Sequence, residues 1–120
     1  MNKFQNGILA GDTNWNKESL RKYGEICKLD QKWIDCWSIA NKNKEKGFTY
    51  DGIKNKTATS KFRSRLDRIF ANFSEKRIDS ISLIGEKPIK NKFFERRKVK
   101  TQLFASDHFG IVCELKMRID

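Results

Sequence analysis

The apolar positions of this chain fall in short runs that polar segments separate. The first run, residues 8–10, stops at Gly11-Asp12, a pattern typical of a buried strand whose end reaches the edge of a sheet. Apolar positions at helical spacing then predict one short amphipathic helix over residues 16–28, packed on the sheet. Residues 33–38 are predicted to form a short strand or turn.

Alternating apolar and polar positions predict three further strands, at residues 63–70, 78–84 and 111–115. In the first of them, Asp67 shares its parity with Arg65 and Ile69, so we expect its carboxylate to point inward. Polar, lysine-rich segments predict solvated loops at residues 41–47, 54–61 and 90–100. Asp51-Gly52 is a turn signal.

These elements predict a single α/β domain. A chain of 120 residues is long enough for one modest core and too short for two independent ones. The sequence shows no internal repeat and no low-complexity linker. We expect one mixed or antiparallel sheet with a helix on one face.

The charge balance narrows the choice of partner. With 26 Lys and Arg against 15 Asp and Glu, the net charge is +11, which favours nucleic acid, with an anionic membrane surface as the alternative. No segment has the length of a transmembrane helix or a secretory signal, so we expect an intracellular protein of the nucleus or cytoplasm. Cys27, Cys36 and Cys113 lack C-x-x-C spacing and predict reduced thiols.

Asp12 and Asn14 lie two positions apart, directly after the first apolar run. If the extended backbone continues through Thr13, both side chains point to one face, where a carboxylate beside an amide donor suits phosphate chemistry. The alternative is a turn or a helix N-cap, since both residue types are common there.

The only histidine, His108, follows Asp107 in the segment before the last predicted strand. An imidazole in that place can bind a phosphoryl oxygen or stabilise developing charge. Asp67 is a candidate to orient the ring, and a salt bridge from Asp67 to Arg65 or Arg68 is the alternative. Asp107 is either a magnesium ligand, directly or through water, or the cap of a turn.

Aromatic residues are interleaved with Lys and Arg, a pattern that suits the stacking of single-stranded bases over a surface that follows the phosphates. Trp15, beside Asn14, and the basic segment with Arg96 and Arg97 are best placed to meet such a substrate. The other tryptophans fit core packing better.

Five motifs occur in an order that resembles the endonuclease/exonuclease/phosphatase family: GDTN at 11–14, DCW at 35–37, FTYD at 48–51, RLDRIF at 65–70 and SDHFG at 106–110. Within that family the likeness is strongest to the 5′-tyrosyl-DNA phosphodiesterases, which remove topoisomerase peptides from DNA ends. The resemblance implies the C-terminal half of a two-sheet α/β sandwich. It also implies phosphodiester hydrolysis with Mg²⁺, or Mn²⁺ in its place, on DNA that is single-stranded or presents a 5′ end.

The same resemblance implies a role for each motif residue. Asp12 is similar to the catalytic acid that positions the attacking water, and Asn14 to the residue that helps hold the phosphate. Asp67 is similar to the acid that orients the histidine, and His108 to the histidine that contacts the phosphate. Asp107 is similar to the acid near the magnesium.

The chain also departs from the family pattern. Tyr50 stands where the tyrosyl enzymes usually carry Trp, which keeps an aromatic ring for substrate contact. The family's first half supplies an early Asn and a magnesium-binding Glu, whereas this chain starts only a few residues before Gly11. We therefore expect residues 1–120 to be a partial domain without the N-terminal half, weak or inactive alone, with that half in trans as a partner. The alternatives are a non-catalytic basic fragment that binds nucleic acid and a phosphatase of a small phosphorylated substrate.

Overall fold

The computed structural model describes residues 6–15, 33–41 and 44–117. The strands in these ranges are β1 (Ile8–Asp12), β2 (Ile34–Asp35), β3 (Tyr50–Asp51), β4 (Arg63–Ser64), β5 (Asp67–Ala71), β6 (Ile78–Ile84), β7 (Phe93–Arg96), β8 (Val99–Gln102) and β9 (Gly110–Leu115). The helices are α2 (Cys36–Ala40) and the single 3-10 turn η1 (Glu75–Arg77).

The strands form several small sheets, and every pairing is antiparallel. β5 lies between β1 and β2, while β3 pairs with β4, β6 with β9, and β7 with β8. The expectation of one continuous sheet is therefore wrong. Residues 72–77, which include η1, turn the chain away from β5, so β6 finds its partner in β9 and not in the sheet of β5.

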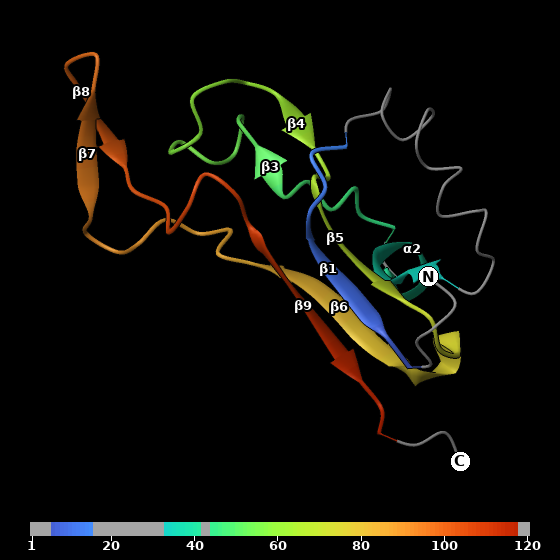
Figure 1. The fold of residues 1–120 in the computed structure, drawn as a ribbon. Coiled ribbons are helices and arrows are strands. Elements are labelled where there is room, and N and C mark those ends of the chain that lie inside the picture. The colour runs from blue at the N-terminus through green and yellow to red at the C-terminus, as the bar shows by residue number, and fades with distance from the viewer. Residues whose placement is uncertain (1–5, 16–32, 42–43, 118–120) are drawn as a thin grey trace.

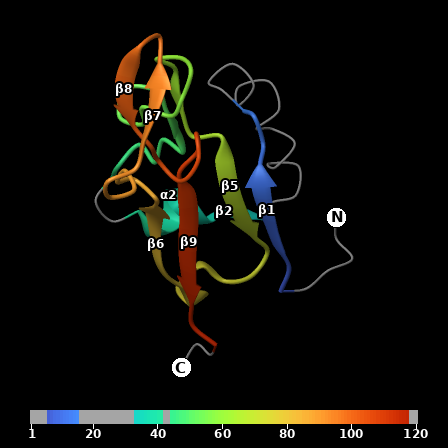
Figure 2. The same ribbon diagram turned by 90° about the vertical axis from the view of Figure 1, so that its left-hand side faces the viewer.

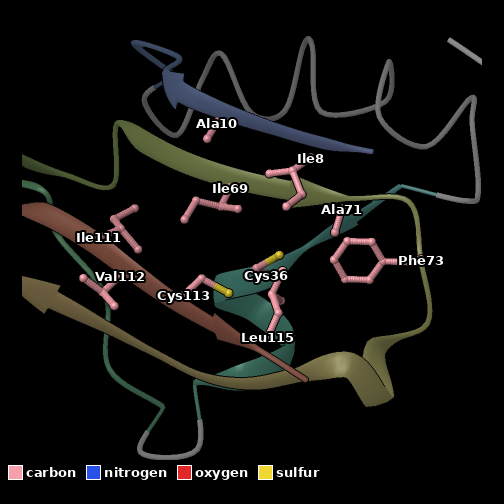
Figure 3. Close-up of a pocket in the computed structure, with 10 residues that line it drawn as sticks. All are labelled: Ile8, Ala10, Cys36, Ile69, Ala71, Phe73, Ile111, Val112, Cys113 and Leu115. Carbon is pink, nitrogen blue, oxygen red and sulfur yellow. The ribbon is translucent and has the colours of Figure 1, made fainter. Parts of the chain in front are cut away.

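The sheet of β1, β5 and β2 and the pair β6–β9 lie as two layers, with α2 packed against β5 and β6 (Figures 1 and 2). Cys36, Ala71 and Ile78 form the buried core between these elements. A cavity of about 350 Å³ separates the β1–β5 face from β9, and apolar side chains line it from both sides (Figure 3).

Two of the predicted strands are confirmed closely: β6 covers residues 78–84, and β9 starts one residue before the predicted 111–115. The predicted strand 63–70 is instead interrupted between β4 and β5. At the break, the N–H groups of Leu66 and Asp67 donate to the hydroxyl of Thr49.

The segment 90–100 is not a loop, as its composition predicted, but contains most of the β7–β8 hairpin. Residues 33–38 contain β2 and the start of α2, which Asp35 caps by accepting a hydrogen bond from the N–H of Trp37. The predicted helix at 16–28 lies outside the described residues. In the part of the chain that the structure describes, no helix is long and apolar enough to cross a membrane.

Candidate active site

The ends of β1 and β5 bring two carboxylates together. Asp12 lies directly opposite Asp67 in the antiparallel register, two residues beyond the apolar pair Ala10–Ile69. Alternate residues of a strand share a face, so both carboxylates continue the face that lines the cavity in Figure 3. Like charges opposite each other destabilise a sheet, and this pair therefore calls for a compensating cation or donor.

His108 supplies such a donor. Its Nδ1 lies 2.7 Å from Oδ2 of Asp67, and because a carboxylate only accepts, this nitrogen carries the proton. The N–H of His108 donates to Oγ of Ser106 at 3.1 Å, which fixes the loop before β9. One ligand atom from each of Asp12, Asp67 and His108 lies within 4.8 Å of the others. With Nδ1 occupied, Nε2 is the ring nitrogen left to meet a substrate.

The charge of His108 follows from these contacts. Its partial burial alone would lower the pKa, but the hydrogen bond and charge of Asp67 outweigh this effect. Together with the charges of Asp107 and Asp12, they raise the pKa of His108 above its ordinary value of 6.5. The interaction of charged His108 with these carboxylates stabilises the folded state. This stabilisation is complete below the pKa of His108 in the unfolded chain and is lost as the pH rises through its raised pKa in the folded protein.

Replacing Asp67 with Asn is expected to lower the pKa of His108, because the amide cannot attract the imidazolium as the carboxylate does. An NMR titration of the ring measures this directly, since the chain has one histidine. Asp79→Asn is the control, as this exposed carboxylate of β6 pairs with Lys116 and not with the ring. Equal pKa values of His108 in wild type and Asp67→Asn would contradict the orienting role.

The same cluster fits a hard divalent cation. Among the described His, Cys, Asp and Glu residues, Asp12, Asp67 and His108 are the group whose ligand atoms lie close enough to hold an ion. Oδ2 of Asp67 accepts a hydrogen bond from the imidazole, which leaves Oδ1 of Asp67 and the carboxylate of Asp12 as oxygen ligands for an ion. Oxygen ligands of this kind suit Mg²⁺, which keeps several waters in its shell.

No family model matches the sequence, and no curated protein matches it. Solved structures do match. A crystal structure of D. rerio TDP2 complexed with single strand DNA product is 26% identical with a TM-score of 0.68, and the match covers 92% of this chain and 41% of that one. A crystal structure of truncated Caenorhabditis elegans TDP2 is 23% identical with a TM-score of 0.63, over 90% of this chain and 37% of that one. The chain has a partial TDP2-like fold.

The TDP2-like fold confirms the resemblance to the endonuclease/exonuclease/phosphatase family and the α/β class. The chain spans about two fifths of the length of the TDP2 structures that it matches. Their fold is therefore represented here in part, and the cluster of Asp12, Asp67 and His108 lies within that part.

Asn14 and Asp107 lie at the margin of the Asp12–Asp67–His108 cluster. Asn14 has a left-handed φ of 53°, and its backbone N–H donates to Oδ1 of Asp12 at 2.8 Å. The extended backbone therefore does not carry both side chains onto one face, because the turn that Asp and Asn favour forms here. Asp107 is exposed, accepts a hydrogen bond from Ser106 Oγ at 3.4 Å, and is not among the three clustered ligands.

The two candidate aromatic residues have different surroundings. The ring of Tyr50 meets that of His108 edge-on, with centroids 5.5 Å apart, and its hydroxyl lies 3.3 Å from Oγ of Ser60. Trp15 is half-buried and packs against Phe70, with ring centroids 6.1 Å apart. Tyr50 therefore borders the cluster of Asp12, Asp67 and His108, whereas the Trp15 ring packs on Phe70.

Arg96 has a use that its sequence context did not predict. Its guanidinium donates to the carbonyls of Lys56, Thr57 and Ala58 over 2.8 to 3.0 Å, which ties β7 to that loop. A guanidinium held in this way serves the fold and is not free for phosphate. Arg97 is exposed at the turn between β7 and β8, so of the two arginines it alone presents its charge to solvent.

Thr49 is a buried residue that sequence reasoning missed and that positions the site. Its Oγ1 accepts hydrogen bonds from the N–H groups of Leu66 and Asp67, each at 3.0 Å. Its carbonyl accepts from the N–H of Phe109 at 2.6 Å. One residue thus joins the start of β5, which carries Asp67, to the loop that carries His108.

Asn55 completes this support from the other side of the loop. It is fully buried, donates from Nδ2 to the carbonyl of Ser106 at 2.8 Å, and accepts from the N–H of Thr57 at 3.0 Å. It lies in a polar segment whose composition predicts a solvated loop, so no pattern in the sequence signals its burial.

Proposed function

We propose that this chain is part of a metal-dependent phosphodiesterase that acts on DNA ends, as the 5′-tyrosyl-DNA phosphodiesterases do. The observation that carries the proposal is the cluster of Asp12, Asp67 and His108 within 4.8 Å, in a partial TDP2-like fold. Phosphodiester hydrolysis needs one group that positions water and others that offset charge on the phosphoryl oxygens. The cluster contains candidates for both tasks.

His108 is the candidate that offsets charge. Asp67 holds the ring through Nδ1, so the Nε2–H group can donate to a phosphoryl oxygen of the substrate. The raised pKa of His108 extends the pH range in which the ring is charged, and the charged ring stabilises the developing negative charge. Asp67 acts through His108 and is therefore a positioning residue in this scheme.

Asp12 is the candidate that positions the attacking water. Its exposed carboxylate at the end of β1 can accept a hydrogen bond from water and direct the oxygen toward phosphorus. Asn14, exposed on the following turn, is the candidate amide donor to the phosphate. A phenolate leaving group, with a reference pKa of about 10, needs little help from a general acid.

The residues that would hold Mg²⁺ or Mn²⁺ are Asp12 and Asp67, with Asp107 nearby on the loop of His108. When bound, the ion supplies Lewis-acid stabilisation of the phosphoryl oxygens. Its charge would also offset the repulsion between the two carboxylates that face each other across β1 and β5.

DNA is the proposed substrate class. The net charge of +11 suits a long polyanion better than a small phosphorylated molecule. The matched D. rerio TDP2 structure holds single strand DNA product, which supports a single strand or a 5′ end as the part recognised. Such a reaction would take place inside the cell, in the nucleus or the cytoplasm.

We further propose that residues 1–120 work as one part of a larger domain, completed by an N-terminal half. β1 exposes apolar side chains on both of its faces, with Ile8 55% and Leu9 53% exposed. Apolar surface of this kind is typical of a strand that another layer covers. A complementing half would cover it and supply the further metal ligand.

One observation favours the non-catalytic alternative, a module that binds nucleic acid without cleaving it. Among the described residues, no Glu belongs to the cluster that could hold an ion. Two carboxylates and a histidine would bind magnesium weakly, because this ion needs fixed oxygen ligands in a near-octahedral shell.

The test is to assay residues 1–120, alone and mixed with the N-terminal part of a TDP2 domain, on a 5′-tyrosyl oligonucleotide and on a plain phosphodiester. We expect slow hydrolysis by the chain alone and faster, Mg²⁺- or Mn²⁺-dependent hydrolysis of the tyrosyl substrate by the mixture. Asp12→Asn should abolish the gain. Retained DNA binding with no hydrolysis in any mixture would overturn the enzyme proposal and favour the binding module.

A further inference from the structure

The β7–β8 hairpin carries a large share of the charge of the molecule. Residues 90–102 contain six Lys or Arg and one Glu, a net charge of +5 in a chain whose total is +11. Figure 1 shows the hairpin standing apart from β1, β5 and β6. Positive charge concentrated on one projecting element indicates a surface for a polyanion.

The hairpin is fixed to the body of the protein. The three hydrogen bonds of Arg96 attach it to residues 56–58. Within the hairpin segment, the N–H of Leu103 donates to the carbonyl of Lys92 at 3.0 Å, and the N–H of Ile89 donates to the carbonyl of Leu103 at 2.7 Å. The base of the hairpin is therefore closed, and its tip is held in a defined place. A ligand bound there loses little affinity to ordering of the hairpin.

The turn at the tip contains two basic residues in strained backbone positions. Arg97 and Lys98 have φ values of 49° and 63°, and both form the two-residue turn that Asn-Gly favours. Side chains with a Cβ carry a cost at left-handed φ, and residues kept there despite the cost are often functional. The two cations point to binding, since Asn-Gly would make a more stable turn.

Beside the turn, aromatic and basic side chains share one hollow. It has a volume of about 450 Å³ and is lined by Phe93, Phe94, Glu95, Lys98 and Lys100. Phe93 is 46% exposed, and Nζ of Lys100 lies 4.3 Å from the centroid of its ring. Because an exposed cation–π contact is weaker than a base stacked on an aromatic ring, a base can displace the ammonium, which then lies beside the phosphates.

We propose that the β7–β8 hairpin binds the single-stranded DNA that extends from the Asp12–Asp67–His108 cluster, an inference that rests on the proposed function. Phe93 stacks on a base, while Arg97, Lys98 and Lys100 contact the phosphates. Gln102 at the end of β8 and His108 are six positions apart, so they lie within about 20 Å of each other. At about 3.4 Å per nucleotide, a strand of about six nucleotides spans this distance.

The first experiment replaces the turn with Arg97→Asn and Lys98→Gly, which removes two charges and relieves the left-handed strain. Binding of a fluorescent 20-nucleotide oligo(dT) is measured by anisotropy in EDTA at several salt concentrations. We expect affinity to fall by about tenfold or more at 0.1 M salt, and the slope of log K against log salt to flatten by up to about 1.4.

The matched control is Lys44→Asn with Lys46→Gln, since Lys44 also has a left-handed φ, of 52°, and both side chains are exposed. This pair lowers the net charge equally but lies away from the hairpin, so its effect on affinity should be much smaller. Equal losses in the two double variants, or no loss in the turn variant, would overturn the proposal. Thermal unfolding checks that both variants fold.

The stacking role has its own test. Phe93→Leu should weaken binding of the 20-nucleotide strand by about fivefold or more and leave binding of inorganic polyphosphate unchanged, whereas Phe93→Tyr should restore affinity for DNA. Equal affinity of Phe93→Leu and wild type for DNA would remove the stacking contact. These binding measurements need no hydrolysis. If the mixture hydrolyses the tyrosyl substrate but the turn variant binds DNA like wild type, only the hairpin proposal is overturned. If no mixture hydrolyses the substrate but the turn variant and Phe93→Leu weaken DNA binding as expected, only the proposed enzymatic function is overturned.

Discussion

Replacing His108 with Ala is expected to lower the rate of phosphodiester hydrolysis by about 10²- to 10³-fold, the loss usual for one preorganised donor to a developing oxyanion. The ring is the group that Asp67 holds at 2.7 Å with Nε2 left for substrate, and no second histidine exists to replace it. The rate is measured on the 5′-tyrosyl oligonucleotide in the mixture with the N-terminal part of a TDP2 domain.

The pH dependence of the same rate adds a second readout. Because the charged imidazolium is the active form, the wild-type rate should fall as the pH rises through the raised pKa of His108. In His108→Ala, most of the hydrolysis rate should be lost, and the remaining rate should no longer fall as the pH rises through this range. A His108→Ala rate within about threefold of wild type would mean that the donor makes no transition-state contact.

Thr49→Val is expected to reduce the free energy of unfolding by about 2 to 4 kcal/mol, because it leaves the N–H groups of Leu66 and Asp67 without an acceptor at a buried position. Thr49 has no exposed surface, and its hydroxyl accepts both bonds at 3.0 Å. Val has nearly the same shape, so the change in packing is small. Urea unfolding followed by tryptophan fluorescence measures the difference.

Thr49→Ser is the matched control, since it keeps the hydroxyl and loses one methyl group. It should cost less than Thr49→Val although its packing is poorer. The reverse order would show that Thr49 stabilises the loop by packing and not by hydrogen bonding. The Val variant should also shift the NMR signals of His108, because Thr49 joins the segments that carry Asp67 and His108.

The strands that were predictable are those with plain alternation. β9 carries Ile111, Cys113 and Leu115 at every second position, and β6 carries Ile81 and Leu83 in the same way; these five residues are all partly buried. The β7–β8 hairpin escaped detection because its lysines and arginines are typical of a solvated loop. Its turn contains Arg97-Lys98 in place of the Asn-Gly that usually reveals such a hairpin.

Some residues of the candidate site could be predicted from the sequence and others could not. Asp12, Asp67 and His108 lie in motifs whose order along the chain could be recognised, and the structure places them together. Thr49 lies in the FTYD motif, but its buried role could not be predicted, and neither could that of Asn55, because a buried polar residue that satisfies backbone groups has the same composition signal as a turn residue. The use of Arg96 as a tie to residues 56–58 depends on tertiary contacts about 40 positions apart, which no local pattern encodes.

The most direct test of the account is a double-mutant cycle on the hydrolysis rate, with Asp67→Asn, His108→Ala and the two combined. Because Asp67 holds His108, the loss of rate in the double variant should be much smaller than the product of the two single losses, since residues that act as a unit have non-additive effects. The account would be contradicted if the fold loss of hydrolysis rate in the double variant equalled the product of the fold losses in the two single variants, since Asp67 and His108 would then act independently.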